Sequence, residues 1–337
     1  MNANPLRPAW LALALLLASL LLMLLGAGVG STGWESVWRL AAPDADPLAW
    51  QIVRDIRLPR TMGAWLAGAL LGLAGAVAQG VFRNPLADPY LLGSASGASL
   101  GVALAMAALG VSPFALQGLL RLGITGAAFA GAVGAVLLTL LLAKGAHNTM
   151  RLLLAGVVVG VVLGAASSMV LMLSPEIMQA MQSFMLGSTS FVGWGACALM
   201  AAVLALVALL AWSLSRVLDG LALGESTALS LGLPLAPLRL LLIVVMALAT
   251  GTAVAQTGLI AFVGLAAPHL VRSLVRAMHG GLLLLSAGMG AVLLLGADLL
   301  ARWLIAPQEL PVGVLTAVLG GTYLLWLMHR RNVRELS

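Results

Sequence analysis

The sequence predicts an all-α membrane protein with about ten transmembrane helices in a single domain, residues 1–337. Of its 337 residues, 62% are hydrophobic and only 8% are charged, whereas a soluble domain carries roughly 25% charged residues. The mean hydropathy is +1.10, and apolar runs long enough to cross a bilayer recur along the whole chain. These observations exclude a soluble protein of this length.

The apolar runs give the expected helices in chain order. The first is about 20 residues long, where the apolar region of a signal peptide has roughly 7–15, so we interpret it as a membrane helix rather than a cleaved leader. The run 258–271 is short for a span, so we expect it to be buried among other helices. The expected cores are residues 9–30, 62–82, 92–110, 122–143, 151–173, 191–214, 238–256, 258–271, 281–301 and 311–328.

The basic residues predict the orientation of these helices. With the N-terminus in the cytoplasm, eleven Lys and Arg fall on the inner side and six on the outer side, which favours cytoplasmic N- and C-termini. Because the basic residues are scattered between apolar runs, we do not expect a nucleic-acid partner.

The chain shows no sign of catalysis or of a metal site. Its single cysteine, Cys197, supplies no disulfide framework, and its four histidines are not paired at metal-ligand spacing. A P-loop is excluded because the only lysine, Lys144, is followed by Gly145. We therefore expect no bound cofactor and no enzyme activity, and any ATP hydrolysis must take place in another chain. Only Asp298 among the acidic residues lies inside an apolar run, which argues against an ion-coupled transporter without excluding one.

Small-residue spacing and a faint repeat bear on how the helices pack. Glycines recur every four residues at 68–72, 93–101 and 156–164, which places them on one helix face and allows close helix packing. The tetrapeptide AVAQ at 76–79 recurs at 253–256. The two copies fall in helices of expected opposite direction, so they are compatible with a weak inverted repeat or with chance similarity.

The segment of about 216–237 is the longest polar loop expected on the inner side. Ser226 to Leu231 can form a short helix between Gly224 and Gly232. From the residues alone, a docking element for a partner and a simple connector are equally good interpretations.

The segment of about 174–190 interrupts the apolar pattern on the outer side. It predicts a short helix with Ser174 as N-cap, Pro175 in its first position and Glu176 in its first turn. Methionines gather here, and they can line a path for a bulky ligand or simply fill the core. They are Met178, Met181 and Met185, preceded by Met169 and Met172.

Four pieces of sequence, in order, resemble one family of proteins. They are RLPR at 57–60, QGVFRNPLADPYLLGSASGASLG at 79–101, GLIAFVGLAAPHLVR at 258–272 and ELPVGVLTAVLGGTYLLWLM at 309–328. They resemble the permease subunits of type II ABC importers for vitamin B12, iron-siderophores and heme. The resemblance implies a ten-helix permease of the bacterial inner membrane. It also implies a second copy of the chain, two ATPase subunits that use ATP and Mg²⁺, and a periplasmic binding protein as partners.

The resemblance also implies roles for individual residues. Arg57, Arg60 and Arg302 match arginines that meet glutamates of the binding protein, and Asn148 and Thr149 match an inner gate. Met169, Met172, Met178, Met181 and Met185 are then candidates for the translocation path. The 216–237 segment matches a coupling helix to the ATPase, with the candidates Leu223, Gly224, Glu225, Ser226, Ala228, Leu229 and Gly232.

The expected cargo is heme, because Met-rich surface suits a flat apolar macrocycle and the C-terminal LGGTYLLWLM looks closest to heme permeases. Cobalamin and ferric siderophores are the alternatives within the family, and an ion-coupled secondary transporter is the alternative outside it. Residues 183–186 read SFML where many relatives have Trp before the Gly-Ser at 187–188, so the lining of the path stays open.

Overall fold

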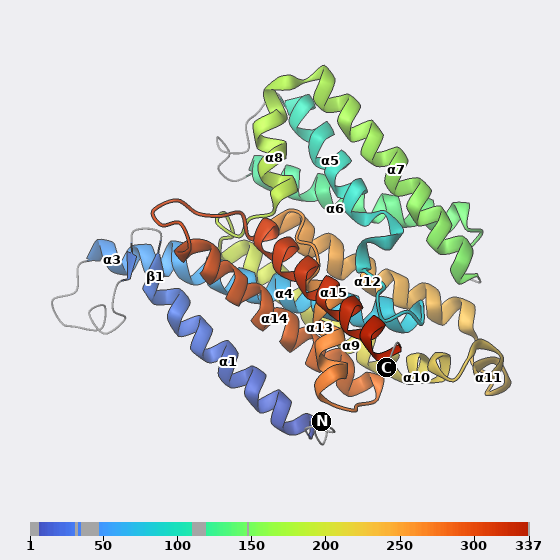
Figure 1. Ribbon diagram of the computed structural model, residues 1–337. Helices are drawn as coiled ribbons and strands as arrows, with labels where there is room; N and C mark the ends of the chain where they lie inside the picture. Colours follow the sequence, from blue (N-terminus) through green and yellow to red (C-terminus); the bar gives the residue numbers. More distant parts are fainter. Residues whose placement is uncertain (1–6, 31–32, 35–46, 110–118, 147, 336–337) are drawn as a thin grey trace.

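A computed structural model describes residues 7–30, 33–34, 47–109, 119–146 and 148–335. Within these ranges ten helices of 12 residues or more form the bundle in Figure 1, which confirms the expected number. Seven of the described helices are long and apolar enough to cross a membrane by length and composition. The ten are α1 (Pro8–Gly28), α4 (Leu58–Val81), α5 (Ser94–Leu109), α6 (Leu119–Leu142), α7 (Thr149–Leu173), α9 (Trp194–Ser213), α12 (Leu235–Thr257), α13 (Val263–Leu274), α14 (His279–Trp303) and α15 (Val312–Glu335).

Short elements connect the long helices. Two strands of two residues each, β1 (Val29–Gly30) and β2 (Gly33–Trp34), pair antiparallel after α1. The others are α3 (Pro47–Ile52), the π-helix η1 (Val53–Arg57), the 3-10 helices η2 (Pro89–Leu92) and η4 (Pro175–Ile177), α8 (Met178–Leu186), α10 (Ser215–Ala222) and α11 (Glu225–Ser230).

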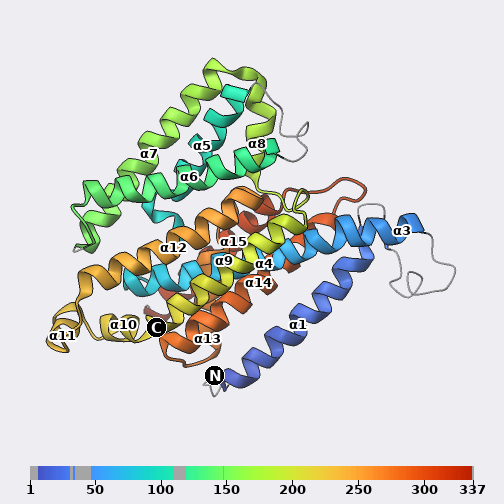
Figure 2. The same cartoon turned by 180° about the vertical axis from the view of Figure 1, so that it is seen from behind.

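The bundle has two distinct ends, seen from opposite sides in Figures 1 and 2. One end carries α10, α11 and both termini of the described chain, and we call it the α11 end. The other carries α3 and α8, and we call it the α8 end. Both described termini lie at one end, which agrees with the predicted placement of both on one side of a membrane. Which compartment that side faces stays a prediction.

Helix α4 forms the centre of the bundle, and α7 lies at its edge. In the most apolar window of each helix, 89% of the residues are buried for the span that contains α4, but only 17% for α7. Helix α7 thus presents an apolar surface that lipid or another protein must cover.

Close packing around α4 and α5 depends on glycine, as the four-residue spacing predicts. A Cβ added to Gly72 would lie 2.2 Å from the carbonyl oxygen of Ser286 on α14, and one on Gly97 would lie 2.2 Å from that of Gly131 on α6. Any larger residue would push these helices apart.

The 258–272 stretch forms most of α13, a short helix that packs against α4. Phe262 precedes α13 in the left-handed backbone region, at φ 69°. The buried Gln79 of α4 donates to the Leu265 carbonyl at 3.1 Å and accepts from the Arg272 guanidinium. The 12-residue α13 packs against α14 and α4, and half of its residues are buried, whereas Arg272, Ser273 and Leu274 at its end are exposed. The expected burial among other helices is therefore confirmed for one face of the helix.

The two AVAQ copies lie on α4 and α12, which pack against each other. The helices run in opposite directions between the two ends (Figure 1), as an inverted repeat predicts.

The turn that follows α4 is held by two hydrogen bonds from backbone N–H groups to side chains. Asn84 accepts from the Leu86 N–H at 2.9 Å, and Asp88 caps η2 by accepting from the Tyr90 N–H at 2.8 Å. Burial raises the pKa of Asp88 above its ordinary value, and the bond from Tyr90 opposes that rise.

Candidate functional site

The first candidate site is the α10–α11 unit, which projects from one end of the bundle (Figure 1). Gly224 separates the two helices at φ 112°, and Gly232 follows α11 at φ 77°. Residues without a Cβ tolerate this backbone conformation best, so the glycines fix both ends of α11. The predicted short helix is confirmed, one residue earlier than expected at each end.

The α10–α11 unit combines an anchored base with an exposed apolar surface. Leu223, Leu229 and Leu231 are 68%, 59% and 65% exposed, and Ser226 is also exposed. Ala228 is fully buried and faces α10 near Gly220. Ala228 therefore shapes the unit from within, while the leucines are available to a partner.

One ion pair and one contact between an aspartate and a histidine attach the α10–α11 unit to the bundle. Asp219 of α10 accepts from the backbone N–H of His279 at 3.0 Å, and the His279 ring Nδ1 lies 2.7 Å from the same oxygen. Glu225 pairs with the buried Arg239 of α12 at 2.5 Å. A movement of α11 is thereby connected to both α14 and α12.

The second candidate site is the surface of α7 and α8, where four of the five predicted path methionines are exposed. They are Met169, Met172, Met178 and Met185. Met181 is different: it is completely buried in a cluster with α5 residues such as Val102 and Met106. Its side chain fills the core in this structure, and the role of the five methionines in the translocation path stays a prediction.

The predicted outer helix is present, as η4 followed by α8. Ser174 occupies the N-cap position and Pro175 begins the helix, but the Ser174 side chain makes no capping hydrogen bond. The predicted position of the N-cap is thus confirmed, but the hydrogen bond expected from its side chain is absent.

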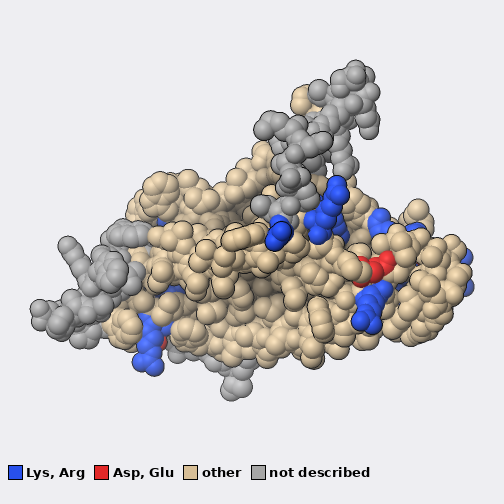
Figure 3. Space-filling view, turned by 90° about the horizontal axis from the view of Figure 1, so that it is seen from below, with Lys and Arg blue, Asp and Glu red and all other residues tan. Residues whose placement is uncertain are grey.

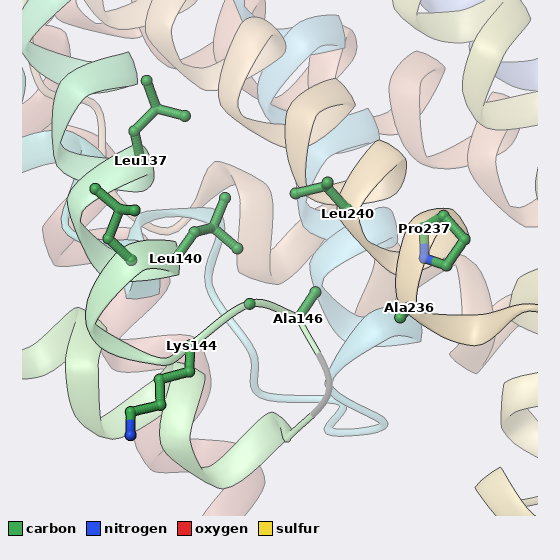
Figure 4. Close-up of a pocket in the computed structure, with 9 residues that line it drawn as sticks. Leu137, Leu140, Lys144, Ala146, Ala236, Pro237 and Leu240 are labelled. Carbon is green, nitrogen blue, oxygen red and sulfur yellow. The ribbon is translucent and has the colours of Figure 1, made fainter.

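Asn148 and Thr149 mark the start of α7 at the α11 end. The Asn148 side chain caps α7 by accepting from the Arg151 N–H at 3.1 Å. Beside this loop is an open apolar cavity of about 630 Å³ between the end of α6 and the start of α12 (Figure 4). The side chain of Lys144 points away from this cavity. Capping explains Asn148 structurally, and a gating role stays a prediction.

The third candidate site is a cluster of charged residues at the α8 end. Asp298 of α14 is fully buried and accepts from Arg302 and from Thr189, and Arg60 of α4 approaches it at 3.2 Å. Arg60 also binds both carboxylate oxygens of Glu309, at 2.9 and 2.8 Å. Two arginines and two carboxylates thus balance in charge within one network.

The same cluster joins distant segments of the chain. Ser190 donates to Glu309 at 3.2 Å, and Arg302 donates to Thr61 at 3.3 Å. The nearby Arg57 donates to the Gly28 carbonyl at 3.4 Å. The network therefore ties together the ends of α1, α4 and α14, the loop after α8 and the loop before α15.

The burial of this cluster corrects one expectation from sequence. Arg57, Arg60 and Arg302 were expected to face a partner protein, yet they are only 5%, 8% and 1% exposed. Their charges are neutralised or hydrogen-bonded within the chain, because the carboxylates that pair with Arg60 and Arg302 come from Asp298 and Glu309. A docking role for them stays a prediction, and it requires these internal pairs to open.

Sequence reasoning missed the parts of Asp298, Glu309 and Thr189 in this cluster. One signal was present: Asp298 is the acid inside an apolar run, and Arg302 follows it by four residues on the same helix face. Thr189 and Glu309 left no such signal, since each reaches the cluster from a loop more than a hundred positions away from Arg60.

On the face shown in Figure 3, the basic side chains gather toward one end of the molecule. In the face shown in Figure 3, most surface is uncharged, and most of the visible Lys and Arg lie over the half with α10 and α11. Among the described residues, no group of three or more His, Cys, Asp or Glu is placed to hold a metal ion.

Comparison with known proteins identifies the family. The model of the FecCD transport family matches residues 14–330. The chain belongs to the FecCD transport family. The hemin transport system permease protein HmuU of Yersinia pestis is 39% identical over 328 residues, which cover 96% of each chain. The vitamin B12 import system permease protein BtuC of Escherichia coli O157:H7 (strain EC4115 / EHEC) is 38% identical over 322 residues, which cover 95% of this chain and 94% of the relative.

Solved structures agree with the FecCD assignment. An inward-facing metal-chelate type ABC transporter matches with a TM-score of 0.84 and 30% identity, over 96% of this chain and 100% of that one. PsaBC from Streptococcus pneumoniae, solved with a Fab, matches at a TM-score of 0.56 and 17% identity, which shows a likeness of fold alone. The FecCD chain is thus a multi-pass membrane permease subunit of the ABC transporter type.

Proposed function

We propose that the chain is the permease subunit of an ATP-driven importer that moves heme from the periplasm to the cytoplasm. The observation that carries the proposal is the 39% identity to the hemin permease HmuU over 96% of both chains. The exposed methionines of α7 and α8 support it, since thioether side chains form adaptable apolar surfaces that suit a flat macrocycle.

Cobalamin is the second candidate cargo. BtuC is 38% identical over almost the same length, one percentage point below HmuU. A ferric siderophore is the third, in keeping with the metal-chelate type transporter of similar structure. Because the two sequence identities are nearly equal, a transport measurement must decide which cargo the chain carries.

The proposed assembly has two copies of this chain, two ATPase subunits and a periplasmic binding protein, in the inner membrane. The exposed leucines of the α10–α11 unit support an ATPase at the α11 end, because an apolar surface outside the membrane favours a protein partner. The Lys and Arg at that end support its placement in the cytoplasm. The poorly buried α7 supports contact with the second copy.

The proposal is tested with the chain in liposomes together with its ATPase and binding protein. ATPase activity and uptake are measured with hemin, cobalamin and a ferric siderophore in turn. Hemin-dependent stimulation with hemin entering the lumen supports the full proposal, and stimulation by another ligand replaces the cargo. Uptake that follows an imposed ion gradient without ATP would support the ion-coupled alternative instead.

A further inference from the structure

Arg239 makes contacts that join three separate parts of the chain. It lies in the second turn of α12 and is 2% exposed. Its Nη2 pairs with Glu225 Oε1 of α11 at 2.5 Å, and its Nη1 donates to the Ala146 carbonyl oxygen at 3.0 Å. Ala146 belongs to the loop between α6 and α7. One guanidinium group thus holds α11 and this loop against α12.

The chemistry of arginine suits this position. The guanidinium group is planar and presents several N–H groups in fixed directions, so it can bind a carboxylate on one side and a carbonyl on the other. Both bonds involve a charged donor, which makes them stronger than neutral hydrogen bonds. Because Glu225 supplies the opposite charge for a buried cation, its loss would favour reorientation of Arg239 and weaken the bond to Ala146.

The loop between α6 and α7 is held on one side and open on the other. The cavity of about 630 Å³ beside it is lined by Leu137, Leu140 and Leu141 of α6, by Ala146, and by the first residues of α12 (Figure 4). Ala146 lies two positions before Asn148, which caps α7. A displacement of Ala146 therefore has room to occur and would shift the start of α7.

The other contact of Arg239 is with α11, which is exposed to a partner. Gly224 and Gly232 flank α11 with left-handed backbone conformations, and the leucines of the unit are exposed to a partner. A force on α11 would act on Glu225, and through it on Arg239.

We propose that Arg239 is a positioning residue that transmits movement of α11 to the α6–α7 loop and so to the start of α7. The structural link is independent of cargo, whereas its consequence for transport rests on the proposed function. Glu225 of α11 contacts Arg239, and Arg239 in turn contacts the α6–α7 loop at Ala146.

Hydrogen exchange on the purified chain tests the link without any partner. Glu225→Gln removes the charge on α11, and we expect amide exchange in the α6–α7 loop and the first turn of α7 to rise by about tenfold, a coupling of ordinary size between two sites. Arg239→Lys keeps the positive charge but removes the planar guanidinium group that makes both contacts, so we expect a similar rise of amide exchange in the loop. Arg276→Gln is the matched control, because Arg276 is an exposed arginine between α13 and α14.

Loop exchange in Glu225→Gln equal to that of wild type and of Arg276→Gln would overturn the proposal. If Arg239→Lys fails to fold, Glu225→Gln still decides, because it leaves Arg239 in place.

Transport in liposomes then tests the consequence. We expect Glu225→Gln and Arg239→Lys to lower hemin uptake per ATP hydrolysed by about tenfold, with Arg276→Gln unchanged. Normal uptake per ATP in both variants contradicts the inference. Absence of ATP-driven uptake in the wild-type chain contradicts the proposed function instead, and the exchange data still decide the structural link.

Discussion

At the scale of single residues, the charges inside the bundle are arranged in compensating pairs. Asp298 is fully buried, yet Arg302 and Arg60 both approach it and Thr189 donates to it. A buried ionic network of this kind is costly to break from one side, because the remaining charges lose their partners in a low-dielectric environment.

Replacement of Asp298 by Asn is expected to be strongly destabilising. It leaves Arg302 and part of Arg60 without a counter-charge, so we expect the free energy of unfolding to fall by about 3–5 kcal/mol. Glu309→Gln is the comparison, because the Glu309 side chain is 25% exposed and water can replace part of the lost interaction. Unfolding in detergent measures both, and an equal loss in the two variants would contradict this account of the cluster.

Two glycines of α6 provide a matched test of helix packing. A Cβ on Gly131 would lie 2.1 Å from the Gly97 carbonyl oxygen, whereas one on Gly134 would meet nothing within 4 Å. We expect Gly131→Ala to cost about 1–3 kcal/mol through forced separation of α5 and α6. Gly134→Ala should be neutral or stabilise by up to about 1 kcal/mol through helix propensity. Thermal unfolding of the two variants measures the contrast, and similar midpoints would refute it.

Sequence could predict that these residues matter, but it could not predict their partners. The RLPR arginines stood out because they match a motif of the family, yet Arg60 pairs with Glu309 across 249 positions. Such pairs depend on how helices are arranged in space, and a single sequence does not contain that arrangement. The burial of Met181 could not be predicted for the same reason, since exposed and buried methionines look alike in an apolar sequence.

At the scale of elements, local signals were reliable wherever glycine and proline terminate a helix. Gly224 and Gly232 lie at the two ends of α11, as the sequence predicts. These signals act through the backbone of a few adjacent residues, so they survive in a sequence without knowledge of the fold.

The α10–α11 unit supports a prediction about assembly. Leu229 and Thr227 are both exposed on α11, but only Leu229 offers an apolar side chain. We expect Leu229→Asn to weaken binding of the ATPase by about tenfold, as removal of an apolar anchor does at other interfaces, and Thr227→Asn to have little effect. Titration of the ATPase against the chain in nanodiscs measures both. Equal affinities for the two variants would argue against the leucine surface as the docking site.

At the scale of the whole molecule, burial divides the bundle into a dense centre around α4 and an open edge at α7. Sequence predicted about ten helices because each is apolar and long, and nearly all their bounds agree within a few residues. It did not predict which helix is central, because α4 and α7 are both apolar. Both helices carry glycines, but Gly68, Gly72 and Gly75 of α4 all lie against the backbone of neighbouring helices. On α7 only Gly156 makes such a close approach, whereas Gly160 and Gly164 do not.

The open edge predicts where two copies meet. With Cys197 replaced by Ala, we expect Met172→Cys on α7 to form dimers with a short bis-maleimide in native membranes, because Met172 is 83% exposed on the proposed path side. Leu209→Cys on α9 is the control, since it is also exposed, at 64%, but on another helix. Gel electrophoresis after treatment measures the dimer fraction. Dimers from Leu209→Cys alone would place the interface elsewhere.

The measurement that tests the central claim most directly is uptake by liposomes that contain the chain, its ATPase and its binding protein. Hemin, cobalamin and a ferric siderophore are supplied separately, with and without ATP. The account predicts ATP-dependent accumulation of hemin in the lumen and hemin-stimulated ATP hydrolysis. ATP-dependent accumulation of cobalamin or the siderophore without hemin would contradict the proposed cargo, and accumulation without ATP would contradict the proposed mechanism.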